Sequence, residues 1–143
     1  MDLNNIMIVD DDTDEIEFFI EALLELDPNI NCISANDGLA ALLIIEKNDA
    51  QLPDYIFLDL NMPRMNGKTF LAELKKSERL KDIPVIIHTT SRREEDINET
   101  RCLGADYFLT KPSRFADLKS ILNHILYQKP ILDNKLKGIL TNL

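Results

Sequence analysis

The chain is short of positive charge. It has 16 Lys and Arg against 25 Asp and Glu, which gives a formal net charge of −9 at pH 7. Proteins that bind nucleic acid or anionic membrane surfaces gather Lys and Arg to contact phosphates, and the sequence has no such cluster. We therefore expect neither DNA nor a membrane among the partners. The acidic balance favours the binding of cations.

Long hydrophobic runs are missing as well. No apolar stretch approaches the roughly 20 residues that cross a bilayer, and no basic segment followed by an apolar one marks a secretion signal near Met1. The two cysteines, Cys32 and Cys102, are far apart and do not form a metal-binding pair. A cytoplasmic protein with reduced thiols is the expectation.

Short apolar runs alternate with amphipathic segments along the chain. Its 143 residues, 45% of them hydrophobic, fit a single core. Strands are predicted at 6–9, 30–35, 55–58, 85–89 and 107–110. Five strands alternating with helices indicate an α/β fold with a parallel sheet covered on both faces. A flavodoxin-like doubly wound sheet with strand order 2-1-3-4-5 fits best.

Two details of the first two helices can be predicted. Thr13 or Asp14 is placed to cap the first helix. Leu39, Leu42 and Leu43, with Ile45 as a further candidate, are expected to form the buried face of the second.

The fourth helix, expected at about 92–103, is the most polar of the chain. Ile97 and Leu103 are its only large apolar residues. A helix with little apolar contact has low local stability, so we expect this one to be loosely held.

Charged and hydroxyl side chains follow the predicted strands. Asp10 and Asp11 follow the first strand and Asp59 follows the third, while Thr89 ends the fourth and Lys111 follows the fifth. The carboxyl ends of parallel strands share one edge of a sheet, so these side chains should meet. Carboxylates held close together repel one another unless protons or a cation join them. Mg²⁺, which prefers oxygen ligands, is the natural partner.

This set of residues suits phosphoryl chemistry. With its charge neutralised, Asp59 could act as a nucleophile toward phosphorus. Thr89 and Lys111 would then bind the phosphoryl oxygens, one by a neutral hydrogen bond and one as a point charge. Two simpler interpretations stay open: Asp59 could be an ordinary turn residue, and Lys111 only a structural ion-pair partner.

At these residues the sequence resembles the receiver domain of two-component response regulators. The matching motifs, which occur in the family's order and spacing over about residues 4 to 128, are Val9-Asp10-Asp11, Leu58-Asp59-Leu60-Asn61-Met62-Pro63 with Gly67, Pro84 through Thr89-Thr90, and Gly104-Ala105 with Phe108 and Lys111-Pro112. The Leu-Asn-Met-Pro-Arg loop and the Thr-Thr-Ser ending make the chain similar to single-domain, phytochrome-associated response regulators.

The resemblance implies roles for individual residues. Asp59 would be the phospho-acceptor, and Asp10 and Asp11 the acidic pair that holds Mg²⁺ or Mn²⁺ together with Asp59. Asn61 would offer its backbone carbonyl to the metal. Lys111 would be aimed by a peptide bond to Pro112 that is commonly cis in the family.

The resemblance also implies a function. The chain would be a stand-alone switch that takes a phosphoryl group from a phosphohistidine on a sensor histidine kinase or phosphotransfer protein and later hydrolyses it. Thr89 and Phe108 match the family's switch pair, and the signal would pass by altered binding to a downstream protein. Beyond this self-phosphorylation and autodephosphorylation, no activity on a separate substrate is expected.

Three other functions would use parts of this pattern. A haloacid-dehalogenase-type enzyme needs a second Asp two residues after the nucleophile, where this chain has Asn61. Flavodoxin-like flavin binding needs a phosphate-binding loop after the first strand, where Asp10, Asp11 and Asp12 would repel phosphate. A receiver-like interaction module that is never phosphorylated stays open as the alternative.

Residues 129–143 extend beyond the receiver domain, which we place at 1–128. Pro130 breaks the preceding helix, and apolar residues then recur at helical spacing. These residues are Leu132, Leu136, Ile139, Leu140 and Leu143. We predict a helical extension that either packs back on the domain or supports a homodimer.

Overall fold

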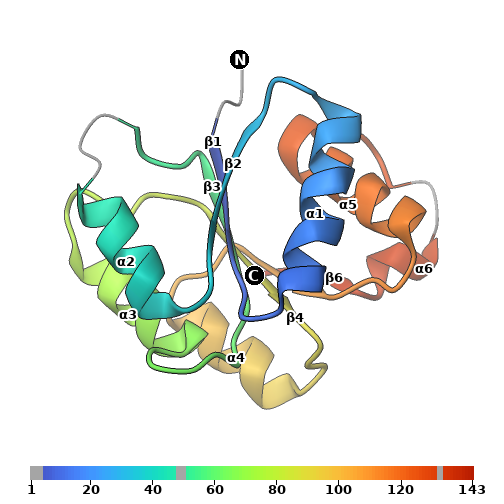
Figure 1. Ribbon diagram of the computed structural model, residues 1–143. Coiled ribbons are helices and arrows are strands. Elements are labelled where there is room, and N and C mark those ends of the chain that lie inside the picture. The colour runs from blue at the N-terminus through green and yellow to red at the C-terminus, as the bar shows by residue number, and fades with distance from the viewer. Residues whose placement is uncertain (1–4, 48–50, 132–133) are drawn as a thin grey trace.

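One six-stranded sheet runs through the computed structural model, which describes residues 5–47, 51–131 and 134–143 (Figure 1). The strands are β1 (Asn5–Val9), β2 (Asn31–Ala35), β3 (Tyr55–Leu58), β4 (Val85–Thr89), β5 (Tyr107–Thr110) and β6 (Leu140–Asn142). Their order is β2-β1-β3-β4-β5-β6, and all neighbours are parallel except β6, which is antiparallel to β5. The predicted α/β fold and the order 2-1-3-4-5 are confirmed, with one strand added at the edge.

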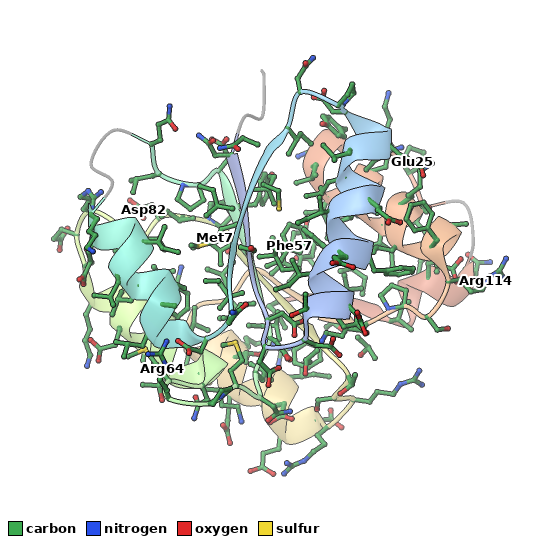
Figure 2. All side chains as sticks on the ribbon, viewed as in Figure 1. Met7, Glu25, Phe57, Arg64, Asp82 and Arg114 are labelled. Atoms are coloured by element: carbon green, nitrogen blue, oxygen red, sulfur yellow. The ribbon has the colours of Figure 1, made fainter. Side chains whose placement is uncertain are left out.

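Helices cover both faces of the sheet. They are α1 (Thr13–Leu26), α2 (Gly38–Lys47), α3 (Gly67–Lys76), α4 (Glu94–Cys102), α5 (Phe115–Tyr127) and the short α6 (Asn134–Lys137). Helices α1 and α5 lie on one face, and α2, α3 and α4 on the other (Figure 1). Successive strand residues point to opposite faces, so Met7 and Phe57 belong to different apolar clusters (Figure 2). None of the described helices has the length and apolarity of a membrane span.

Helix α1 is capped one residue earlier than predicted. The Asp12 carboxylate, rather than Thr13 or Asp14, accepts hydrogen bonds from the backbone N–H groups of Asp14 and Glu15. An acid followed three residues later by Glu is a known helix-start pattern. Asp12 and Glu15 therefore indicate in the sequence where α1 begins.

Helix α2 buries Ile45 as predicted, but the predicted leucine face is not its buried face. Its buried residues are Gly38, Ala41 and Ile45, whereas Leu43 is 47% exposed. The cause lies at its first turn, where the Gly38 N–H donates to the Met65 carbonyl at 3.0 Å. Because of this close approach, the helix face that carries Gly38 is buried, and Ala41 and Ile45 lie on the same face.

Helix α4 is held by polar contacts that its sequence did not indicate. Its buried residues are Asp96 and Thr100, while Ile97 is only partly buried against the core. Asp96 accepts hydrogen bonds from Lys68 Nζ on α3 at 2.7 Å and from Ser91 Oγ at 2.5 Å. The bond from Lys68 is the main cause that lowers the pKa of Asp96. These polar contacts add to the few apolar ones, and the expectation of a loosely held helix stays a prediction.

The extension after α5 is only partly helical. Helix α6 has four residues, and Ile139, Leu140 and Leu143, which were expected to continue it, instead belong to or flank β6. Leu132 lies outside the described residues. The outer edge of β5 offers unpaired backbone groups that a further strand can satisfy, and this contact overrides the helical spacing. The extension thus packs back on the sheet, and a homodimer stays a prediction.

Candidate functional site

Three acids converge where β1 and β3 end. Asp10 and Asp11 follow β1 and Asp59 follows β3, and these strands pair in parallel up to Val9 and Leu58. The Asp59 N–H continues the pairing by donating to the Val9 carbonyl at 2.9 Å. One carboxylate oxygen from each of the three acids lies within 4.8 Å of the others. The strand register itself brings the acids together.

The acids differ in burial. Asp10 is 1% exposed and Asp59 7%, whereas Asp11 is exposed. Asp10 Oδ1 accepts a hydrogen bond from the Asp12 N–H at 2.9 Å, and Asp10 Oδ2 lies 2.7 Å from Lys111 Nζ. A set of three carboxylates within 4.8 Å of one another, two of them buried, fits a hard divalent cation.

Lys111, from the end of β5, reaches the same cluster. Its Nζ lies 2.7 Å from Asp10 Oδ2 and 3.6 Å from Asp59 Oδ2. Burial acts to lower the pKa of Lys111, but the hydrogen bond that Nζ donates to Asp10 and the charges of both acids outweigh it and raise the pKa. The peptide bond to Pro112 is trans, so the expected cis bond is not found. A hydrogen bond from the Lys111 N–H to the Thr89 carbonyl, at 2.7 Å, fixes the backbone instead.

The Asp59 carboxylate is largely buried, which disfavours its ionised form. Its Oδ1 accepts from the Leu60 N–H at 2.8 Å, and the Thr89 side chain lies close enough to the carboxylate to act on its pKa. Burial is the largest influence on the pKa of Asp59 and raises it; the charge of Lys111 lowers it, and that of Asp10 raises it. The net result is a raised pKa, so the ionised form is costly and nearby positive charge relieves it.

The raised pKa predicts a pH-dependent gain in stability for Asp59→Asn without metal. A folded-state pKa above the unfolded value of 3.8 means that the folded protein binds more protons, so stability falls as pH rises through this interval. At pH 7 the full cost is present, and we expect Asn to raise the free energy of unfolding by about 1 kcal/mol. The gain should vanish below pH 3.8. Urea unfolding of both proteins at pH 7 and below pH 3.8 measures this difference. A stability gain of Asp59→Asn that grew as the pH fell would contradict the prediction.

Two predicted residues lie apart from the acids. Phe108 is 1% exposed and belongs to the apolar cluster on the α2 to α4 side of the sheet. Asn61 is exposed and lines a hollow of about 320 Å³ together with Lys68, Ser91 and Arg93. The expected role of the Asn61 carbonyl as a metal ligand stays a prediction.

A loop contact beside Asp59 was not predicted. Arg64 has a left-handed φ of 62°, and its Nε lies 2.6 Å from Asp37 Oδ2. The other carboxylate oxygen of Asp37 accepts from the Ala40 N–H at 2.8 Å. This pair ties the loop after Asp59 to the start of α2. Its two residues are far apart in sequence, so no local pattern could have indicated it.

Known proteins share this arrangement. A family model described as the response regulator receiver domain matches residues 6–123. The response regulator Rcp1 of Synechocystis sp. is 32% identical over 124 residues, which cover 84% of each chain.

Two solved structures are similar over nearly the whole chain. The phosphorylated cyanobacterial phytochrome response regulator RcpA superposes with a TM-score of 0.82 at 29% identity, covering 92% of this chain and 100% of that one. The Mn²⁺-bound form of Rcp1 has a TM-score of 0.80 at 29% identity, covering 91% and 99%.

Proposed function

The chain belongs to the response regulator receiver domain family, and from this premise we propose that it is a switch in which Asp59 accepts a phosphoryl group from a phosphohistidine. The supporting observation is the convergence of Asp10, Asp11 and Asp59 with Lys111 at one sheet edge. RcpA, which is similar in fold, has been solved in a phosphorylated form.

The proposed step is a phosphoryl transfer. An oxygen of Asp59 forms a bond to phosphorus while the P–N bond of the phosphohistidine breaks and the imidazole leaves with the electron pair. Lys111, 3.6 Å from Asp59 Oδ2, and the Thr89 side chain, which lies beside the same carboxylate, would bind the phosphoryl oxygens. In the reverse of activation, water attacks phosphorus, and phosphate leaves as the Asp59 carboxylate is restored.

Asp10, Asp11 and Asp59 would hold a divalent metal. Their carboxylates are suited to Mg²⁺ or Mn²⁺, and Rcp1 has been solved with Mn²⁺. The family resemblance adds the backbone carbonyl of Asn61. A bound divalent ion would supply charge neutralisation, which brings Asp59 and an anionic phosphodonor together.

The partners follow from the step. Receiver domains typically interact with histidine kinases and with downstream target proteins. We propose a sensor histidine kinase or a phosphotransfer protein as the donor, a cytoplasmic location that such a donor requires, and a protein target rather than DNA. Thr89 and Phe108 would carry the signal to the surface, with a coupling of about 1–3 kcal/mol that is typical of allosteric proteins.

Intact mass after incubation with acetyl phosphate tests the proposal. The native chain should gain one phosphoryl group with Mg²⁺ and none with EDTA, and Asp59→Asn should gain none with Mg²⁺. The control is Asp117→Asn, which removes one acid from the first turn of α5 and should gain mass like the native chain. No gain by the native chain with several phosphodonors would favour the alternative, an interaction module that works without phosphorylation.

A further inference from the structure

Strand β6 covers the outer edge of β5 at the predicted switch residue. The register pairs Phe108 directly with Thr141. On either side, the Thr110 N–H donates to the Ile139 carbonyl at 2.9 Å, and the Leu143 N–H donates to the Asp106 carbonyl at 3.0 Å. The extension is therefore bonded to β5 along the whole stretch that contains Phe108.

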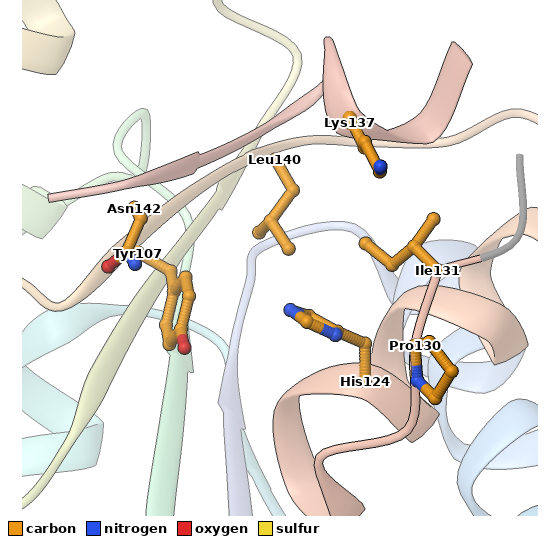
Figure 3. Close-up of a pocket in the computed structure, with 7 residues that line it drawn as sticks. All are labelled: Tyr107, His124, Pro130, Ile131, Lys137, Leu140 and Asn142. Atoms are coloured by element: carbon orange, nitrogen blue, oxygen red, sulfur yellow. The ribbon is translucent and has the colours of Figure 1, made fainter. Parts of the chain in front are cut away.

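The two faces of β6 meet different parts of the domain. Leu140 and Asn142 face α5, across a pocket of about 370 Å³ that Tyr107 and His124 also line (Figure 3). Because side chains alternate along a strand, Thr141 and Leu143 face α4. Substitutions at neighbouring positions of this strand therefore reach different faces of the sheet.

Thr141 and Leu143 supply part of the surroundings of Phe108. Thr141 and Phe108 line the same small hollow of about 100 Å³, which Ile97 of α4 also lines. Leu143 packs against the apolar cluster to which Phe108 belongs. Phe108 is only 1% exposed, although β5 would be the edge strand without the extension.

Phe108 is also connected to the acid cluster. It pairs with Ile87 of β4, two residues before Thr89, and Thr89 pairs with Thr110. Phe108 and Thr89 thus belong to the same face of the sheet, on neighbouring strands. In this structure the buried ring occurs together with a Thr89 side chain that lies beside the Asp59 carboxylate.

We propose that β6 is a positioning element for phosphoryl acceptance. Thr141 and Leu143 keep Phe108 buried, and the buried ring keeps the Thr89 hydroxyl turned toward Asp59, where it can bind a phosphoryl oxygen. Without them, the ring would face water on its outer side and lose the apolar contacts that hold it. Because coupling is reciprocal, phosphoryl binding should in turn strengthen the docking of β6. This inference rests on the proposed function.

A pair of charge substitutions tests it. Leu143→Asp places a carboxylate against the apolar cluster around Phe108, whereas Asn142→Asp places the same charge on the α5 face of the same strand. The probe is beryllium fluoride with Mg²⁺, a phosphoryl mimic, with affinity measured by ¹⁹F NMR. We expect Leu143→Asp to weaken its binding at least about fivefold, the low end of typical allosteric coupling. Asn142→Asp should bind within about twofold of the native chain.

Two further measurements separate positioning from general damage. Mn²⁺ affinity should be the same in all three proteins, because residues 134–143 form no hydrogen bond or ion pair with Asp10, Asp11 or Asp59 in the described part of the chain, whereas a misfolded domain would lose both affinities. Thr141→Pro removes a backbone donor from β6 without adding charge, and it should reproduce the loss if Leu143→Asp unfolds.

The outcomes distinguish the inference from the function on which it rests. Equal beryllium fluoride affinity in the native chain, Leu143→Asp and Thr141→Pro would overturn the role of β6 and leave the proposed function intact. No binding by the native chain in Mg²⁺ would overturn the proposed function together with this inference.

Discussion

Replacing Lys111 with methionine is expected to slow phosphorylation of Asp59 by about 10²–10³-fold, the usual cost of removing one group that stabilises transition-state charge. The same change should tighten Mn²⁺ binding by about tenfold, or about 1.4 kcal/mol. The reason is that Nζ lies 2.7 Å from Asp10 and 3.6 Å from Asp59, where its charge repels a metal ion but attracts a phosphoryl group. Slower phosphorylation combined with tighter Mn²⁺ binding is the result that this position of Lys111 predicts.

The rate of mass gain from acetyl phosphate and Mn²⁺ titration by EPR measure the two effects. Lys119→Met is the matched control: it removes a cation from an exposed pair with Glu25 at 2.9 Å and should change neither. Breaking a buried ion pair can cost about 3–5 kcal/mol, so Lys111→Arg, which keeps the charge, serves as a second variant and should retain native Mn²⁺ affinity. A parallel loss of phosphorylation and Mn²⁺ binding in folded Lys111→Met would show that Lys111 is only structural.

Substituting Gly67 with alanine is expected to lower the free energy of unfolding by about 3 kcal/mol or more, at the upper end of overpacking effects. A Cβ atom at this position would lie 2.2 Å from the Asp59 carbonyl oxygen and 2.8 Å from Leu60 Cα. Both atoms belong to the backbone, so the loop itself has to move. Because Asp59 moves with it, phosphorylation should fall together with stability.

Gly104→Ala provides the comparison. Gly104 has a φ of +97°, and the nearest atom to an added Cβ is the flexible end of Lys75 at 3.2 Å. Backbone strain alone should cost about 1–2 kcal/mol, and phosphorylation should stay native. Urea unfolding of both variants gives the ranking. A smaller loss for Gly67→Ala than for Gly104→Ala would contradict the close packing of α3 against Asp59.

Much of the fold could be predicted because apolar runs mark buried parallel strands. The bounds of β4 and β5 match the predicted 85–89 and 107–110. Once the strand order was inferred, the meeting of Asp10, Asp11 and Asp59 followed, since carboxyl ends of parallel strands share an edge. The convergence of these acids could therefore be predicted from local sequence patterns and strand order alone.

The remaining features depend on contacts between distant parts of the chain. The ion pair between Lys68 and Asp96 joins α3 to α4. The residues that flank Lys68 and Asp96 in the sequence give no indication of this pair. The apolar spacing after Pro130 fits a helix, but residues 140–142 form β6 because β5 offers an open edge. A segment of three residues has too little pattern to tell helix from strand.

The most direct measurement locates the phosphoryl group on the chain. After incubation with acetyl phosphate and Mg²⁺, borohydride reduction converts an aspartyl phosphate into a stable product, and tandem mass spectrometry of all tryptic peptides, including the one that ends at Arg64 and contains Asp59, identifies the modified residue. We predict modification at Asp59 alone, and none after EDTA treatment. Modification at Asp10, Asp11 or His124, or an unmodified chain in the presence of Mg²⁺, would contradict the assignment of Asp59 as the phospho-acceptor.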